Sequence, residues 1–362
     1  MGRTDSPKTR GTGSTIPGRF EVQVTESVPD GWDMPEELLP PAPTTVTAEC
    51  ARSVISRNAS PDIPFDQSVN PYRGCEHGCI YCYARPSHAY VNLSPGLDFE
   101  RRLFYKANAA ELLEDELRRP GYRCTPINLG ANTDPYQPVE RKLRVTRALL
   151  EVLARFQHPV TLITKGAALV LRDLDILVPM AQRRQISVAV SLTTLDDALK
   201  RVLEPRAAGP ASRLRLIEKL TSAGIPVTVL VAPVIPFVTD AELEAILTRA
   251  AAAGAQAAGY SLLRLPHEVE TLFRAWLLEH FPDKAAHVMS LIQQLHGGRA
   301  YDPRWGVRHR GQGPYADMLQ QRFRLSCRRL GLATDRGHTA LDCAAFRVPA
   351  RAGDQLDLFA GA

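Results

Sequence analysis

The chain has 362 residues and a formal net charge of +5, and 44% of its residues are hydrophobic while 23% are charged. This composition is ordinary for a globular protein, and the length allows one large domain or two. No apolar run is long enough to span a bilayer, because the longest, at 227–238, is short and contains two prolines. The N-terminus lacks the apolar core of a signal peptide, so we expect a cytoplasmic protein without membrane contact.

Residues 1–65 are rich in Pro, Ser, Thr and Gly without a sustained period, which predicts a disordered or loosely packed N-terminal arm. Residues 66–266 alternate short β-branched runs with amphipathic segments such as VTRALLEVLARF and ASRLRLIEKLTSAG. This α/β alternation predicts a parallel sheet covered by helices, and its six units suit a partial, open (β/α)6 barrel. The strands are expected near residues 69–73, 126–132, 159–166, 186–194, 225–236 and 257–266.

Residues 267–348 turn helical and Arg-rich, which predicts an extension appended to the barrel. Positions 299–329 contain eight arginines, two aspartates and no lysine, with aromatic residues between the arginines. Such a surface suits phosphate backbones and stacked bases, so DNA is a candidate partner. The alternative is that YADMLQQRFRLSCRRL, at 315–330, is an ordinary amphipathic helix.

The stretch NPYRGCEHGCIYCYARP, at 70–86, places Cys75, Cys79 and Cys82 within eight residues. Such crowding favours metal or redox chemistry over a disulfide framework. With spacings of three and two residues, the thiolates can converge on one face of a cubane iron–sulfur cluster and bind three of its four irons. No fourth cysteine is near in sequence, which leaves one iron open for another ligand.

Gly74 and Gly78 would relieve the crowding of the backbone in so tight a loop. Two alternatives to the cluster remain open. One is a zinc site with His77 or His88 as the fourth ligand, although zinc knuckles favour paired C-x2-C units and the loop holds one such pair. The other is a chance grouping of structural thiols.

The C-x3-C-x2-C motif, with an aromatic residue before its last cysteine and a position after the first strand of the β-α series, resembles that of the radical S-adenosylmethionine (SAM) superfamily. The resemblance covers about residues 69–265. It implies a [4Fe-4S] cluster whose open iron chelates SAM, and reductive cleavage of SAM to methionine and a 5′-deoxyadenosyl radical that abstracts hydrogen from substrate. It also implies an electron donor such as flavodoxin or ferredoxin. Within the superfamily, GCEHGCIYCYARPSH and NTDPYQPVE look most like uncharacterised bacterial proteins related to spore photoproduct lyase.

The resemblance assigns roles to residues near the carboxyl ends of the strands, where parallel barrels place their active sites. Tyr81 is implied to contact the adenine of SAM, with simple packing as the alternative. Asn132, Thr133 and Asp134 offer acceptors for the ammonium group of SAM, although the superfamily's common Gly-Gly-Glu sequence is absent here. Plain turn chemistry at Asp134 and the proline after it is the alternative.

Lys165 ends the third strand, and in the photoproduct-lyase branch a similarly placed lysine meets the SAM carboxylate; a solvated lysine is the alternative. Ser191 is the matching candidate for the ribose hydroxyls, and it can also simply satisfy a backbone group. The backbone of Ala232 and Val234 is expected to lie against the adenine.

Spore photoproduct lyase carries a cysteine hydrogen-atom donor in its second β-α region, and LGANTDPYQP contains no cysteine. Cys124 is nearest, but it precedes the strand and should lie at the wrong end of the barrel. Tyr136 can in principle donate hydrogen instead. The departure places direct thymine-dimer reversal by the same mechanism in doubt.

The segment 349–362 is expected to be a flexible tail. Its residues Gln355, Leu356, Leu358 and Phe359 resemble the short peptide with which bacterial DNA enzymes bind the sliding clamp. The alternative is that these apolar side chains fold back on the barrel. The whole pattern predicts a radical SAM enzyme acting on DNA; the alternatives are a radical SAM enzyme that modifies a protein, peptide or RNA, and a non-catalytic zinc-binding module.

Overall fold

The computed structural model describes residues 10–20, 43–334 and 340–351. Within them a seven-stranded sheet has the order β10-β9-β8-β7-β6-β3-β2. Neighbouring strands are parallel except β2, Ile55–Arg57, which is antiparallel to β3. The parallel strands are β3 Gln67–Val69, β6 Ile127–Leu129, β7 Val160–Thr164, β8 Ile186–Ser191, β9 Val227–Val234 and β10 Ala257–Leu262.

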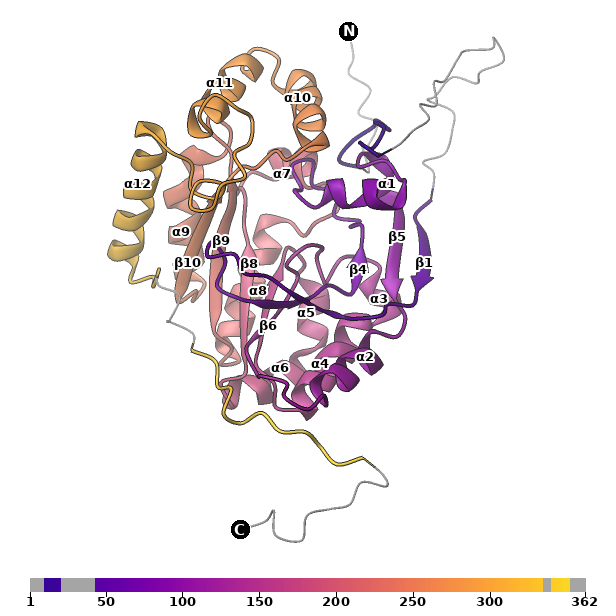
Figure 1. Cartoon of the computed structure of the whole chain (residues 1–362). Coiled ribbons are helices and arrows are strands. Elements are labelled where there is room, and N and C mark those ends of the chain that lie inside the picture. Colours follow the sequence, from indigo (N-terminus) through magenta and orange to yellow (C-terminus); the bar gives the residue numbers. More distant parts are fainter. Residues whose placement is uncertain (1–9, 21–42, 335–339, 352–362) are drawn as a thin grey trace.

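The parallel strands are those expected from the sequence, and the two edge strands β10 and β2 do not pair with each other, so the partial, open barrel is confirmed (Figure 1). Side chains alternate between the two faces of each strand. Val160 and Leu162 of β7 are buried in the core beneath the outer helices. The opposite, inner face carries polar residues in register, and Asn128 Nδ2 donates to Thr161 Oγ1 at 2.9 Å.

Helices cover the outer face of the sheet (Figure 1). The helical patterns expected at 145–156 and 211–224 are confirmed as α4 and α8. The apolar stripe of α4 is buried against the strands, as its amphipathic pattern predicts. These helices are α2 Ala109–Leu117, α4 Val145–Arg155, α5 Ala168–Arg172, α6 Leu174–Gln182, α8 Pro210–Ser222 and α9 Leu243–Ala252, with the 3-10 helix η3 Asp240–Glu242 before α9. Two short helices lie elsewhere: α3 Glu140–Leu143 packs against Tyr72 and Leu103, and α7 Asp197–Leu203 packs against the cysteine loop and α10.

In its described stretches, 10–20 and 43–65, the N-terminal arm makes specific contacts and contains β1 and β2, whereas residues 1–9 and 21–42 lie outside the described residues. β1, Thr45–Glu49, pairs in parallel with β5, Arg102–Lys106, and the short β4, Tyr72–Arg73, pairs with the other edge of β5. β1 lacks a sequence signal because it is a short edge strand whose side chains are exposed. The 3-10 helix η2 and the helix α1 complete this region at Arg85–Val91 and Leu97–Arg101.

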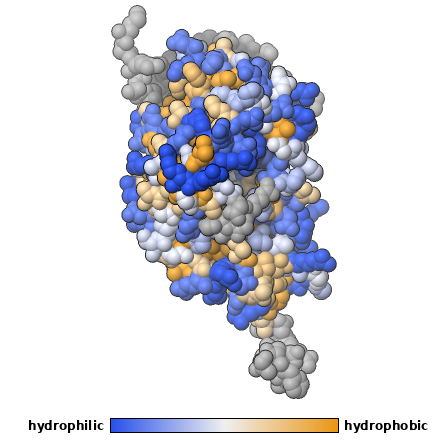
Figure 2. All heavy atoms as spheres, turned by 90° about the vertical axis from the view of Figure 1, so that its left-hand side faces the viewer, coloured by the Kyte–Doolittle hydropathy of each residue, from blue (hydrophilic) through white to orange (hydrophobic). Residues whose placement is uncertain are grey.

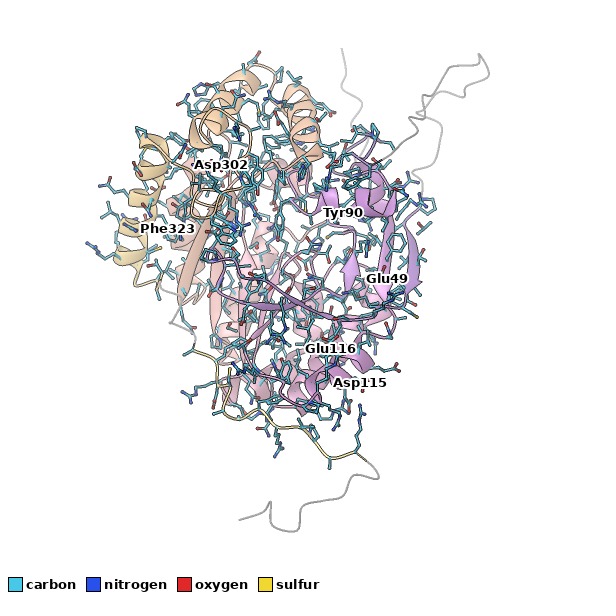
Figure 3. The ribbon with its side chains drawn as sticks, viewed as in Figure 1. Glu49, Tyr90, Asp115, Glu116, Asp302 and Phe323 are labelled. Atoms are coloured by element: carbon cyan, nitrogen blue, oxygen red, sulfur yellow. The ribbon has the colours of Figure 1, made fainter. Side chains whose placement is uncertain are left out.

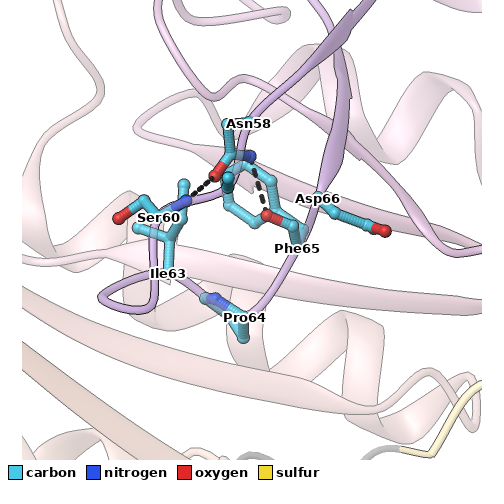
Figure 4. A pocket seen from close by; sticks show the side chains of 7 residues that line it. Asn58, Ser60, Ile63, Pro64, Phe65 and Asp66 are labelled. Carbon is cyan, nitrogen blue, oxygen red and sulfur yellow. Dashed lines mark hydrogen bonds between the residues drawn. The ribbon is translucent and has the colours of Figure 1, made fainter.

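A loop at 58–66, between β2 and β3, crosses the open side of the barrel (Figure 1). Asp62 of this loop accepts hydrogen bonds from the backbone N–H of Gly306 at 2.7 Å and from Arg308 Nε at 2.6 Å. The loop therefore links the β2 edge of the sheet to the C-terminal extension. A shallow pocket lined by residues of the loop itself is shown in Figure 4.

The helical extension consists of α10 Glu268–His280, α11 Ala285–Leu295 and α12 Pro314–Leu330. Residues 340–351 then run along the amino-terminal end of the barrel, where Arg118 Nη1 donates to the carbonyl of Pro349 at 2.6 Å. None of the helices in the described residues is long and apolar enough to cross a membrane. The residues expected to bind a sliding clamp lie outside the described residues: Gln355, Leu356, Leu358 and Phe359.

We predict that Asp62→Asn lowers the free energy of unfolding by about 1.5–3 kcal/mol, because it weakens charge-assisted hydrogen bonds of a largely buried carboxylate. The side chain of Asp62 is 8% exposed in its pair with Arg308. Asp175→Asn is the matched control, since Asp175 is 59% exposed and surface ion pairs contribute about 0–1 kcal/mol. Urea denaturation measures both, and equal losses would contradict the structural role of the loop.

Candidate active site

The cysteine loop, residues 70–86, follows β3 at the carboxyl edge of the sheet. Gly74 and Gly78 adopt φ angles of +77° and +67°, in the left-handed region that favours glycine. A Cβ at Gly78 would lie 2.7 Å from Oε2 of Glu100, so a larger residue would displace that carboxylate. The expectation that these glycines permit a tight loop is confirmed.

The three thiols of the loop are largely removed from water. Cys75 and Cys79 are 7% and 8% exposed, Cys82 is partly buried, and all three are free of disulfides. Burial raises the pKa of each thiol, to about 12 for Cys79. Thiolates in such a place need neighbouring positive charge, which iron supplies, so this donor set fits the iron–sulfur cluster.

A single zinc ion fits the loop less well. No three His, Cys or carboxylate side chains among the described residues lie close enough together to hold one metal ion. In a cubane each cysteine binds a different iron, so a cluster does not need such convergence. His77 Nδ1 lies 3.3 Å from Asp134 Oδ2, and His88 Nε2 lies 2.9 Å from the carbonyl oxygen of Arg102.

A buried ion pair anchors the C-terminal half of the loop. Arg85 Nη2 lies 2.5 Å from Glu100 Oε1, and both side chains are fully buried. Arg85 also donates to the carbonyl oxygens of Cys79 and Gly78 at 3.0 and 3.3 Å. Glu100 accepts in turn from the backbone N–H of Gly11 at 2.8 Å. The described N-terminal stretch therefore covers the loop directly, although the sequence placed it in a loose arm.

Asp134 joins the loop to the end of β7. It accepts from Thr164 Oγ1 at 2.7 Å and from the backbone N–H of Lys165 at 2.6 Å, and it faces His77. Burial alone would raise the pKa of Asp134, but the charge of His77 and these hydrogen bonds lower it to about 2. Both carboxylate oxygens of Asp134 therefore have hydrogen-bond partners within the protein. The contact with the SAM ammonium group that the sequence predicts stays a prediction.

Glu204, directly after α7, forms a second buried centre. It pairs with Arg213, accepts from the Tyr81 hydroxyl, and accepts from Thr193 Oγ1 at 2.8 Å. Burial alone would raise the pKa of Glu204, but the charges of Arg213 and Lys165 lower it to about 2. Glu204 is thus a carboxylate at neutral pH, and it fixes the aromatic ring that lies between two of the cysteines.

The segment after α7 also holds the N-terminal half of the loop. Arg206 Nη2 lies 3.0 Å from Glu76 Oε1, and its backbone N–H donates to the carbonyl of His77 at 3.2 Å. The backbone N–H of Ile80 donates to the carbonyl of Leu203 at 3.1 Å. Side-chain and backbone contacts from one segment therefore set the path of the cysteine loop.

Four residues that the sequence assigns to SAM binding lie around the Glu204 centre. Lys165 Nζ is 5.9 Å from the ring centroid of Tyr81. Arg213, which pairs with Glu204, donates to the carbonyl of Ser191 at 2.9 Å. Thr193, which also donates to Glu204, donates to the carbonyl of Ala232 at 3.2 Å. The structure thus brings together Lys165, Tyr81, Ser191 and Ala232, while their contacts to SAM stay predictions.

Asn132 and Thr133 have structural partners near the loop. The backbone N–H of Asn132 donates to Asn70 Oδ1 at 2.8 Å, and Thr133 Oγ1 donates to the carbonyl of Tyr72 at 2.7 Å. These bonds join the turn after β6 to the start of the cysteine loop. The Asn132 side chain is partly exposed, whereas that of Thr133 is buried.

Tyr136 lies away from this grouping. Its hydroxyl donates to Asp173 at 2.9 Å, just before α6, and burial together with that carboxylate raises its pKa. No described hydrogen bond joins the hydroxyl to the cysteine loop, and the hydrogen-donor role stays a prediction. Cys124 precedes β6, as expected, and burial and the neighbouring Cys343 raise its pKa to about 12.

Sequence reasoning missed Glu100, Glu204 and Arg213. Each lies in a segment with several other charged residues, where a charge normally indicates a solvated surface. No spacing or motif distinguishes the buried ones. Only the packing of α1 and of the segment after α7 against the loop identifies them.

The model of the radical SAM superfamily matches residues 69–250, and the chain belongs to this superfamily. An uncharacterized protein of Mycobacterium tuberculosis is 36% identical over 292 residues, which cover 80% of this chain and 82% of that protein. An uncharacterized protein of Methanocaldococcus jannaschii is 26% identical over 174 residues, which cover 48% of this chain and 62% of that protein.

Solved structures of spore photoproduct lyase share the fold. The lyase complexed with dinucleoside spore photoproduct has a TM-score of 0.59 and 13% identity, covering 80% of this chain and 81% of that chain. A mutant of the lyase with bound AdoMet and dinucleoside spore photoproduct has a TM-score of 0.56 and 14% identity, again covering 80% of this chain and 81% of that chain. The resemblance expected from the cysteine motif is confirmed at the level of superfamily and fold.

We predict that Glu204→Gln lowers the free energy of unfolding by about 3–5 kcal/mol, because it leaves the buried Arg213 without a counter-charge. The side chains of this pair are 1% and 0% exposed. Glu151→Gln is the control, since Glu151 is 55% exposed in its pair with Arg147 and should contribute about 0–1 kcal/mol. Anaerobic urea denaturation measures both, and a small loss in both variants would show that the pair does not organise the loop.

Proposed function

We propose that this protein is a radical SAM enzyme that acts on DNA, in repair or processing. The observation that carries the proposal is the set of three thiols on one loop, two buried and one partly buried, with Lys165 and the ring of Tyr81 beside them at the carboxyl edge of a parallel sheet. Superfamily membership implies a [4Fe-4S] cluster and SAM as cofactors.

Cys75, Cys79 and Cys82 would hold the cluster, and the bound cluster supplies an electron for reductive cleavage of SAM to a 5′-deoxyadenosyl radical. Lys165 supplies a positive charge for the SAM carboxylate. Tyr81, held by Glu204, would present its ring to the adenine, and Ser191 is assigned to the ribose hydroxyls. The glycines and buried ion pairs that set the path of the loop support this assignment, because they fix where its residues lie.

DNA as substrate is supported by the similarity to spore photoproduct lyase, whose solved structures contain a dinucleoside spore photoproduct. The C-terminal residues that resemble a clamp-binding peptide support the same choice. We propose further that flavodoxin or ferredoxin delivers the electron and that the enzyme works in the cytoplasm. Anaerobic turnover with ultraviolet-damaged DNA, followed by mass spectrometry of the oligonucleotide, tests the substrate; unaltered DNA together with a modified peptide or RNA would overturn it.

We predict that alanine at Cys75, Cys79 or Cys82 abolishes release of 5′-deoxyadenosine under reducing conditions. Reconstituted wild-type protein should contain about four irons and four sulfides per chain. Cys124→Ala is the control, because Cys124 lies at the opposite end of the barrel and should leave both values unchanged. Stoichiometric zinc without sulfide would refute the radical chemistry.

We predict that Lys165→Ala weakens SAM binding about ten- to a hundred-fold, because it removes a charged hydrogen-bond donor but no cluster ligand. The absorption spectrum of the cluster should not change. Lys142→Ala, at an exposed position of α3, is the matched control. Isothermal titration of the anaerobic holoenzyme with SAM gives both affinities, and equal values would mean that Lys165 is merely solvated.

A further inference from the structure

An arginine that follows the carboxyl end of β10 meets an exposed aromatic ring of the cysteine loop. Tyr83 immediately follows Cys82 and is 41% exposed. The guanidinium carbon of Arg264 lies 4.2 Å from the ring centroid of Tyr83. The hydroxyl of Tyr83 donates to the carbonyl of Ala131 in the turn after β6, which fixes the ring at the rim of the site.

The Arg-rich loop after α11 meets the same rim. The backbone N–H of Leu262 donates to the carbonyl of His309 at 2.9 Å, and His309 Nδ1 lies 3.1 Å from Ser261 Oγ. Arg264 Nη1 lies 3.5 Å from His309 Nε2, and burial lowers the pKa of His309 to about 4, so the imidazole is neutral at pH 7. Arg310, next in the chain, is exposed, with its guanidinium carbon 4.8 Å from the ring centroid of Tyr260.

Several arginines of the extension are already paired with carboxylates. On the face that includes α12, hydrophilic side chains predominate and hydrophobic ones are scattered among them (Figure 2). Phe323, labelled with Asp302 in Figure 3, is buried against Tyr260, so α12 is the ordinary amphipathic helix that the sequence left as an alternative. Ion pairs neutralise some of the arginines: Arg304 with Asp302, Arg308 with Asp62, and Arg322 with Glu244.

Arg264 and Arg310 differ from those arginines. Within the part of the chain that the structure describes, no carboxylate lies within ion-pair distance of either one. Both stack on aromatic rings, which orients the guanidinium without neutralising it. A guanidinium in that state can bind a phosphate through two parallel hydrogen bonds, and an exposed ring beside it can stack on a base.

We propose that Arg264 and Tyr83 form a docking site for a DNA strand, which holds a phosphate on Arg264 and stacks a base on Tyr83, while Arg310 binds another phosphate of the strand on the α12 side of β10. The proposal rests on the proposed function, because it takes DNA as the substrate class. The proposal goes beyond that function because it names the residues that bind the DNA strand near the cysteine loop. Trp305, 60% exposed in the same loop as Arg310, offers a second stacking surface for a neighbouring base.

Fluorescence anisotropy of a labelled single-stranded oligonucleotide with the anaerobically reconstituted holoenzyme tests the site. Arg264→Gln and Arg310→Gln should each weaken binding about ten-fold and lower the slope of log affinity against log salt by about 0.7. Arg304→Gln is the matched control, since it makes the same change in net charge in the same loop but removes an arginine already paired with Asp302. Its affinity and slope should equal those of the wild type.

A comparison of two Tyr83 variants tests whether the ring stacks on a base. Tyr83→Ala should weaken binding about ten-fold by removing the stacking surface, whereas Tyr83→Phe keeps that surface, loses only the hydrogen bond to Ala131, and should weaken binding less. The absorption spectrum of the cluster is recorded for each variant, so a loss of DNA binding is assigned to the site only where the cluster is intact. Equal weakening by alanine and phenylalanine would overturn the stacking role.

Cleavage of SAM by the wild-type holoenzyme, measured without DNA, tests the proposed chemistry separately from docking. If Arg264→Gln and Arg310→Gln bind DNA with the same affinity as the control Arg304→Gln, the docking site is overturned, even where SAM is cleaved. Tighter binding of RNA of the same sequence would overturn the choice of DNA. Absence of binding by the wild type would overturn the docking site and the DNA substrate together, while SAM cleavage would leave the radical chemistry standing.

Discussion

Buried carboxylates hold the cysteine loop, and the candidate active site depends on them. The loop has little regular secondary structure and contains three thiols whose ionisation is disfavoured by burial. Glu100, Asp134 and Glu204 reach it from α1, from the turn after β6 and from the end of α7. An ion pair in a protein interior is costly to desolvate, so such pairs act mainly by specifying one arrangement of their neighbours. Here that arrangement places the thiols at the carboxyl edge of the sheet.

The open barrel leaves one side of the sheet uncovered, and two segments from the N-terminal part of the chain connect the site and the extension there. The stretch 10–20 packs on the cysteine loop through Glu100, and the loop at 58–66 spans the gap to the extension through Asp62. Charged hydrogen bonds hold both segments, and Ile16 of the first also packs against the apolar cluster that contains Cys79 and Tyr81.

The arginines of the chain have different roles, which depend on whether a carboxylate lies close to the guanidinium group. Arg85 and Arg213 are buried counter-charges inside the site, and Arg308 ties one segment to another. Arg264 and Arg310 stack on rings at the rim and lack such partners among the described residues. The same residue type therefore supports the loop in one place and offers positive charge to a ligand in another. What distinguishes the roles is the distance to a carboxylate, which only the folded chain defines.

The sequence by itself determined the parallel strands, the helices α4 and α8, and the three cysteines, because these features repeat locally with a fixed period or spacing. It gave α12 only as an alternative to a surface that binds nucleic acid. It could not determine β1, since a short, exposed edge strand has no periodic signal. It could not separate Glu204 or Arg264 from surface charges either. Their environments are made by contacts between residues far apart in the chain, such as Tyr81 with Glu204 and Tyr83 with Arg264. Tertiary packing decided which charges are buried, paired or open to a ligand, because burial and distance are properties of the fold.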